Sequence, residues 1–374
     1  MSRAMLLFEN SIRSEQTRSQ YKYCLDRFVK FYKLRDAESL LKIDQKQLQI
    51  MIEDYVMYLK KQISPNSFKA PLSAIQAFLI INDISLNWKK IRKLVPAEVK
   101  KSGERGYSTE EVRQILAAAT DKRSKAIIHF LAASGVRIGA LEGLKVRHLV
   151  NLENGCKAAL IYEGSIEEYW TFLTPEASKA LDAYLEQRKN DGEYMDGESP
   201  VFRTKYQVGI SKAKPLKLQS IKGILERIIE RAGINTQKSK RYEVQRAHGF
   251  RKRFNTILKL NREINPNIIE KLMGHTHGLD GVYLKPTRDQ CFAEYKKGIS
   301  DLTIDNHEKL AADRRKLEQD RTELEKQRIE NQTMRKELRE MTGKLVKVTT
   351  IDANNPEVIA IIDKIISQKL ADRI

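Results

Sequence analysis

The hydrophobic positions in the first hundred residues recur every three or four residues. They form three stripes: Tyr21, Leu25, Phe28 and Tyr32, then Leu48, Ile52, Tyr55 and Leu59, then Leu72, Ile75 and Leu79. Positions at this spacing share one face of a helix, so each stripe predicts a helix that buries that face. We therefore expect a helical domain over residues 1–95. Residues 96–107 interrupt the pattern with Pro96, Gly103, Gly106 and a basic run, which predicts a linker.

A second domain is expected over residues 108–300, mostly helical with one β-hairpin. Ser108 and Glu111 have the spacing of a capping box, which predicts a helix start at this point. Residues 157–162 and 169–173 are β-prone and flank a polar turn, 163–168, so they predict the hairpin. Further helices are expected near 247–260, 266–273 and 287–300. The predicted fold class is mainly α with a small β-hairpin or sheet.

The last part of the chain has a different pattern. Leucines recur every seven residues, with an asparagine at one step: Leu310, Leu317, Leu324, Asn331, Leu338 and Leu345. The other core position of such a heptad holds Arg314, Arg321, Arg328 and Arg335, which is a poor hydrophobic seam. Residues 301–347 therefore predict either a long charged helix or a weak coiled coil. Residues 348–374 predict an amphipathic helix whose isoleucine stripe needs a surface to cover it, on this chain or on a protein partner.

Composition and charge narrow the classes of function. The 374 residues suffice for two or three domains, and no apolar stretch reaches the ~20 residues of a membrane-spanning helix. The three cysteines are far apart, so we expect neither a disulfide framework nor a cysteine-rich metal site. Residues 301–374 carry 15 basic and 15 acidic side chains, so the first 300 residues hold the whole net charge of +19. Such a localised basic field favours a nucleic-acid partner over a uniformly lysine-rich surface. The cysteine usage and the N-terminal sequence, which does not resemble a secretory signal, predict a cytoplasmic location.

Three local patterns in the second domain carry candidate chemistry. In the first, Gly135 follows an apolar helix and can end it, which leaves Arg137 at the start of the next helix. In the second, His248 and Arg251 are three residues apart, so we expect both on one helix face, away from the core. An arginine and a histidine together suit a bound oxyanion. Each pattern alone is also typical of ordinary surface residues.

The third pattern is Gly274-His275 followed eight residues later by Tyr283. Gly274 can end the preceding helix, so His275 is expected in a loop. Two other interpretations stay open here. His275, His277 and Asp280 could ligate a metal, although no cysteine or carboxylate cluster completes the set, and Tyr283 could be a core residue.

In this order, the three patterns resemble those of the tyrosine site-specific recombinases, or phage-type integrases, and most closely those of archaeal integrases. The resemblance covers roughly residues 10–300. It implies a helical N-terminal core-binding domain and a mixed α/β catalytic domain that clamp double-stranded DNA, with no cofactor and no metal. It further implies a mobile-element enzyme that assembles as a homotetramer on DNA, in the cytoplasm and associated with the nucleoid.

The resemblance also assigns roles to residues. Arg137 and Arg251 would hold the non-bridging phosphate oxygens, and His248 and His275 would add hydrogen bonds or acid–base help. Tyr283 would attack the phosphodiester and leave a 3′-phosphotyrosyl link with a free 5′-hydroxyl. The family uses a lysine of the hairpin turn as the acid for the leaving oxygen. Here Ile166 stands about where that lysine is expected, and Lys157 at the start of the first strand is a substitute candidate.

Other functions remain compatible with the sequence. A type IB topoisomerase shares the tyrosine chemistry but acts on one duplex. A DNA-binding protein descended from an integrase would have lost catalysis together with the hairpin lysine. A structural protein organised by its C-terminal helix would carry its basic surface incidentally. Only the first of these alternatives predicts a covalent adduct with DNA, as a recombinase does.

Overall fold

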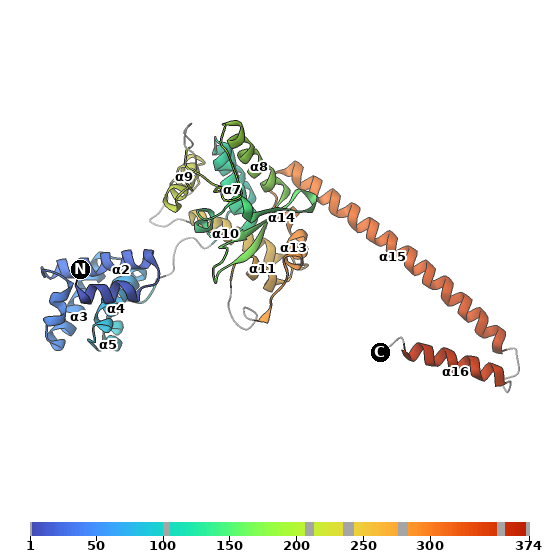
Figure 1. The fold of residues 1–374 in the computed structure, drawn as a ribbon, viewed down its shortest axis with the longest axis horizontal. Coiled ribbons are helices and arrows are strands. Elements are labelled where there is room, and N and C mark those ends of the chain that lie inside the picture. The colour runs from blue at the N-terminus through green and yellow to red at the C-terminus, as the bar shows by residue number, and fades with distance from the viewer. Residues whose placement is uncertain are drawn as a thin grey trace. The chain divides into compact units, whose positions relative to one another are not determined.

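The computed structural model describes residues 2–99, 105–205, 213–234, 243–275, 283–349 and 356–371. The chain divides into two compact units, Met1–Lys101 and Ser102–Ile374 (Figure 1). In its described residues the first unit is built from helices, and the second combines helices with a three-stranded antiparallel sheet. The fold is therefore mainly α with a small sheet, as the sequence predicts.

The first unit is a bundle of five α-helices, with short 3₁₀ turns between them. The helices are α1 (Arg3–Ser11), α2 (Glu15–Phe31), α3 (Gln45–Gln62), α4 (Lys69–Ile81) and α5 (Trp88–Leu94). The predicted stripes form its core, except that Tyr21 and Tyr32 are only half-buried. Helix α1 was not anticipated. Its Phe8 is fully buried, with its ring 5.6 Å from that of Phe78, so α1 closes one side of the bundle.

Four helices of the second unit begin close to the starts predicted from the sequence, at Ser108 and near residues 247, 266 and 287. The described helices of its core are α6 (Thr109–Ala118), α7 (Lys122–Ser134), α8 (Pro175–Asn190), α9 (Leu218–Arg231), α10 (Arg246–Leu260), α11 (Pro266–Leu272), α13 (Arg288–Lys297) and α14 (Ile299–Leu302). Ser108 and Glu111 form the predicted capping box at α6. Thr174 caps α8, whose first residue is Pro175, because a proline is well tolerated there.

The sheet contains the predicted hairpin and one strand more. Strands β2 (Lys157–Ile161) and β3 (Tyr169–Leu173) pair antiparallel, and β1 (Leu149–Asn151) adds to the free edge of β2. β1 was missed because three residues are too short to show alternation. β3 contacts α7 and α8 as well as α11 and α13, so the sheet joins the two hydrophobic clusters of this unit.

The end of the predicted linker packs within the second unit. Tyr107 is buried, with its ring 4.7 Å from that of Phe250. Arg105 forms ion pairs with Glu111 and Glu243 at 2.7 Å. Residues 100–104 of the linker lie outside the described residues.

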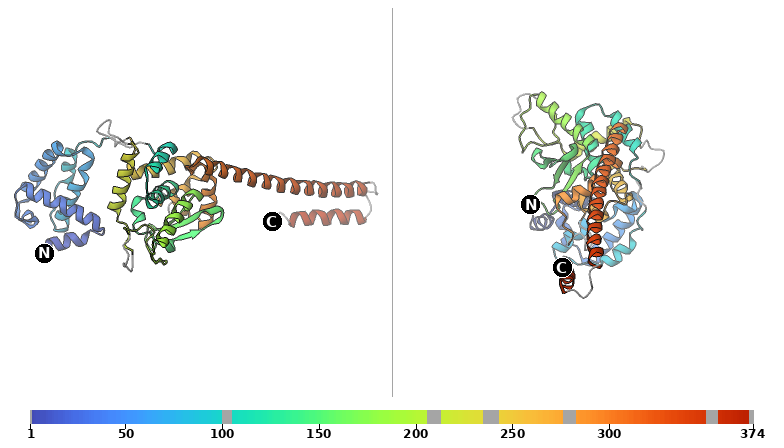
Figure 2. Two further views of the ribbon diagram at one scale, coloured as in Figure 1. Left: turned by 90° about the horizontal axis from the view of Figure 1, so that it is seen from above. Right: turned by 90° about the vertical axis from the view of Figure 1, so that its right-hand side faces the viewer.

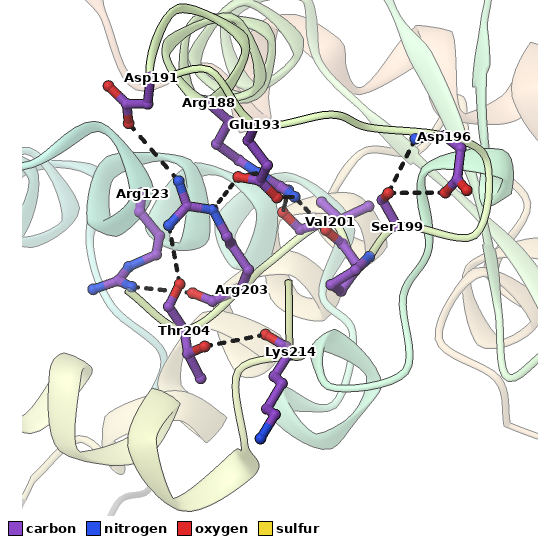
Figure 3. Close-up of polar contacts among 11 residues, drawn as sticks. Arg123, Arg188, Asp191, Glu193, Asp196, Ser199, Val201, Arg203, Thr204 and Lys214 are labelled. Carbon is purple, nitrogen blue, oxygen red and sulfur yellow. Dashed lines mark hydrogen bonds and ion pairs between the residues drawn. The ribbon is translucent and has the colours of Figure 1, made fainter. Parts of the chain in front are cut away.

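The polar loop after α8 is anchored by buried charges (Figure 3). Arg188 is fully buried and donates to Glu193 at 2.5 and 3.0 Å and to the carbonyl of Pro200 at 2.7 Å. Arg203 forms a second ion pair with the same carboxylate. Since both guanidinium groups and the carboxylate are paired, their burial is tolerated, and loss of one partner would leave an uncompensated charge. The loop is thus part of the core.

Two helices follow the second unit's core, α15 (Asn306–Thr349) and α16 (Pro356–Ala371). α15 runs as one uninterrupted helix (Figure 2). Its heptad leucines Leu310, Leu317, Leu324 and Leu338 are exposed, and so are the isoleucines of α16. Residues 302–304, expected in the long helix, are buried instead, so the core extends past residue 300. Among the described helices, none has the combination of length and apolarity needed to cross a bilayer.

Candidate active site

Arg137 is placed by a tight helix end. α7 ends at Gly135, whose φ of +59° lies in the left-handed region that glycine tolerates. A Cβ at this glycine would lie 2.5 Å from the ring of Phe254, so the chain passes directly over α10. Arg137 follows two residues later, as predicted. Its Nη1 atom is buried without a hydrogen-bond partner in the described chain, and Glu167 Oε2 lies 3.9 Å away.

Arg251 lies inside the protein, contrary to the expectation that it shares an exposed face with His248. Its Nη1 donates to the carbonyl of Gly135 at 2.7 Å, and its Nη2 donates to the carbonyl of Met273 at 2.6 Å. The two residues are three positions apart and so lie near each other on α10. α11 packs over Arg251, whereas His248 stays exposed. Arg251 therefore ties the end of α7 to the end of α11.

His248 is exposed on the first turn of α10. Partial desolvation lowers the pKa of its imidazole, and the positive charges of Lys252 and Arg251 and the nearby His275 lower it further. His248 is therefore neutral at neutral pH, and a neutral imidazole can accept a proton.

His275 is held at the end of α11 by partners on both ring nitrogens. Its Nε2 is 2.7 Å from Arg251 Nη2, which has a hydrogen to donate, and its Nδ1 contacts a carboxylate oxygen of Glu270. Nδ1 then carries the proton, because Nε2 accepts from the guanidinium. Partial burial raises the pKa of Glu270, but hydrogen bonds from Lys259 and His275 outweigh it, so the net pKa is lowered. The carboxylate thus stays charged and fixes the orientation of His275.

A cleft of about 550 Å³ joins several of the predicted residues. Arg137 and His275 line it, together with the hairpin turn and β3 at Ile166–Trp170. Leu284 and Lys285, which directly follow Tyr283, line it as well. Tyr283 itself is 79% exposed. The segment that carries Tyr283 therefore borders the same cleft as Arg137 and His275.

Lys157 is not brought to this cleft. It begins β2, at the end of the strand remote from the turn, and its Nζ lies 3.1 Å from Asp182 Oδ1 and 2.5 Å from Asn151 Oδ1. At the tip of the turn Ile166 is 99% exposed. The lysines that line the cleft are Lys271, in the last turn of α11, and Lys285.

Several residues of the site could not be recognised from the sequence. Tyr169 and Arg288 line the cleft, and Glu270 holds His275. Of these three residues, only Glu270 could have been suggested by the sequence. It lies five residues before His275, so the two side chains can meet where the helix ends. For the alternative metal site, His277 and Asp280 lie outside the described residues.

Two arginines and a histidine, Arg137, Arg288 and His275, line a cleft next to the segment that carries Tyr283, and such a set suits a protein that acts on phosphodiesters. Residues 107–279 match the phage integrase family. The chain is 24% identical over 286 residues to the tyrosine recombinase XerC of Anoxybacillus flavithermus, across 74% of this chain and 89% of that protein. It is 26% identical to transposase A of transposon Tn554 from Staphylococcus aureus, across 50% of this chain and 49% of the transposase.

A solved structure has a similar fold. It is the Tn1549 transposon integrase in complex with a circular intermediate DNA, with a TM-score of 0.51 and 15% identity over 79% of this chain and 99% of that one. The chain carries a phage integrase family domain and is a tyrosine recombinase.

Proposed function

We propose that this chain cleaves and rejoins DNA at specific sites through a 3′-phosphotyrosyl intermediate formed on Tyr283. The observation that carries the proposal is the shared cleft, because Arg137, His275 and the segment after Tyr283 all border it. The family match ends at residue 279, before Tyr283. The assignment of Tyr283 as the nucleophile is therefore supported by the sequence pattern and by the position of its segment beside the cleft.

The first step is attack of the Tyr283 oxygen on the scissile phosphorus. A new P–O bond forms to the tyrosine, and the bond from phosphorus to the 5′-oxygen breaks. Arg137 and Arg251 stabilise the charge that grows on the non-bridging oxygens. His248, neutral in the free protein, accepts the phenol proton. His275 supports Arg251 through the hydrogen bond between them.

The leaving 5′-oxygen also needs a proton, and for this step the proposal uses Lys271 in place of Lys157. In an in-line displacement the nucleophile and the leaving group lie on opposite sides of the phosphorus. Lys285 is two residues from Tyr283 and so belongs to the nucleophile's side. Lys271 comes from α11 and lines the cleft independently of that segment. Its ammonium group donates the proton on cleavage and recovers it on rejoining.

The partner in this proposal is double-stranded DNA, bound by a homotetramer, as the resemblance to tyrosine site-specific recombinases implies. The localised charge of +19 supports a polyanionic partner and an association with the nucleoid. The exposed isoleucines of α16 support a further contact with a protein partner.

Covalent trapping on denaturing gels tests the chemistry. The substrate is a nicked duplex that carries the attachment site, selected from random-sequence DNA by binding to the protein. Wild type is expected to form a protein–DNA adduct, and Tyr283→Phe is expected to form none. Tyr194→Phe is the matched control, because Tyr194 is 83% exposed and outside the site. DNA binding without an adduct in the wild type would favour the binding-only alternative.

A further inference from the structure

Two polar groups beside the cleft each hold a hydrogen for which the described residues offer no acceptor. They are the hydroxyl of Tyr169 and Nη1 of Arg137, and both atoms are buried. Arg251 forms a side-chain hydrogen bond with the Tyr169 hydroxyl, but a guanidinium only donates, so the phenol hydrogen still lacks an acceptor. Both side chains line the cleft. A buried donor without an acceptor destabilises the folded protein, so two of them lining one cleft indicate a site shaped for a ligand that accepts hydrogen bonds.

The position of Tyr169 is fixed by its surroundings. It is the first residue of β3, and its ring lies under the end of α11, where a Cβ on Gly274 would approach within 2.4 Å. The ring of Tyr162 lies 6.4 Å away. The Tyr169 side chain thus has little freedom to turn its hydroxyl elsewhere.

The charges around this hydroxyl favour an anion. Arg137 and Arg251 both act electrostatically on Tyr169. Burial nevertheless raises the pKa of Tyr169 to about 12, so the phenol keeps its proton at neutral pH and is a donor rather than a base or a nucleophile. A neutral O–H beside two guanidinium groups suits one oxygen of a phosphodiester.

We propose that Tyr169 is a further catalytic residue, whose hydroxyl donates a hydrogen bond to a non-bridging oxygen of the scissile phosphate next to Arg137. This inference rests on the proposed function, since it names a contact in the same cleft. Three residues of the exposed hairpin turn, Ile166, Glu167 and Glu168, line the same cleft as Tyr169. No bond to Tyr169 forms or breaks during the reaction.

Tyr169→Phe removes only the hydroxyl and keeps the ring that packs on α11. The contact is expected to strengthen as charge grows on the oxygen, so the single-turnover rate of adduct formation should fall about 10- to 100-fold, with DNA affinity within about threefold of wild type. The variant loses the contact with Arg251 together with a phenol hydrogen that has no acceptor in the free protein, so its Tm should stay close to that of wild type. Tyr162→Phe is the matched control and should leave the rate unchanged.

A chemically modified substrate separates this role from a structural one. In duplexes with one non-bridging oxygen of the scissile phosphate replaced by a methyl group, one stereoisomer lacks the oxygen that Tyr169 contacts. Wild type and Tyr169→Phe should react at equal rates on that isomer and differ on the other. Equal defects on both isomers, or an unchanged rate with the normal phosphate, would overturn the inference. An absence of any adduct with wild type would instead refute the proposed function, and this inference with it.

Discussion

In the proposed mechanism the cleavage step depends most directly on Lys271, because a 5′-alkoxide is a poor leaving group without a proton. We expect Lys271→Ala to slow adduct formation about 100-fold with a normal phosphodiester. With sulfur in place of the 5′-bridging oxygen, the thiolate leaves without protonation, so the variant should recover to within a few-fold of wild type. The measurement compares single-turnover rates on the two substrates.

Two further variants complete that comparison. Lys271→Arg keeps the positive charge but cannot release a proton, so it should resemble Lys271→Ala. Lys157→Ala should retain the wild-type rate on both substrates, since Lys157 is paired with Asp182 at the far end of β2. The role of Lys271 is excluded if its variants are equally slow with oxygen and with sulfur.

At the scale of elements, the end of α11 sets the position of His275. Gly274 has a φ of +64°, in the left-handed region. Its Cα lies so close to the ring of Tyr169 that an added Cβ would fit only if the ring or the backbone shifted. Gly274→Ala should therefore cost about 1–3 kcal/mol of stability and displace His275 from Arg251. Adduct formation should fall further than DNA affinity does.

Thermal unfolding and adduct assays check this prediction. Gly143→Ala provides the control, because nothing lies within 4 Å of a Cβ at that position, and both its Tm and its rate should stay close to wild type. A Gly274→Ala variant with wild-type Tm and rate would show that the close approach to Tyr169 is not needed.

Much of this element structure could be predicted because its signals are local. The capping box at Ser108, the helix end at Gly135 and the hairpin each depend on residues adjacent in sequence. The burial of Arg251 could not be predicted, since it results from the packing of α11 on α10. The contact of Tyr169 with Gly274 likewise joins residues more than a hundred positions apart, and nothing in either segment alone indicates it.

For the whole molecule, the effect of a C-terminal truncation should depend on whether it removes residues of the hydrophobic core. Leu302 and Ile304 are buried, Arg253 donates to the carbonyl of Leu302 at 3.1 Å, and Ser300 contacts Asp313. Residues 317–374 carry equal numbers of basic and acidic side chains. A chain that ends at Lys316 should therefore keep the Tm and the DNA affinity of the full-length protein.

A chain that ends at Ser300 is the informative counterpart. This truncation removes Leu302 and Ile304 and exposes the apolar surface on which they pack. Burial of one such side chain contributes about 1.5–3 kcal/mol to the free energy of unfolding, so the Tm should fall by several degrees. Calorimetry and binding titrations at fixed salt compare the two chains. Equal Tm values would mean that residues 301–305 contribute nothing to the core.

The carboxylate of Glu167 beside Arg137 has a consequence for selectivity among anions. In the free protein, an incoming phosphate meets a guanidinium that already has a negative neighbour 3.9 Å away. A small free anion can displace the Glu167 carboxylate only through its own affinity for the arginine. A phosphate within a bound duplex is instead held near the arginine at a high effective concentration by the other contacts of the DNA. With Arg137 as the phosphate ligand of the proposed mechanism, orthophosphate and nucleotides are expected to be weak competitors, because only a phosphate within a bound polymer reaches this arginine at a high effective concentration.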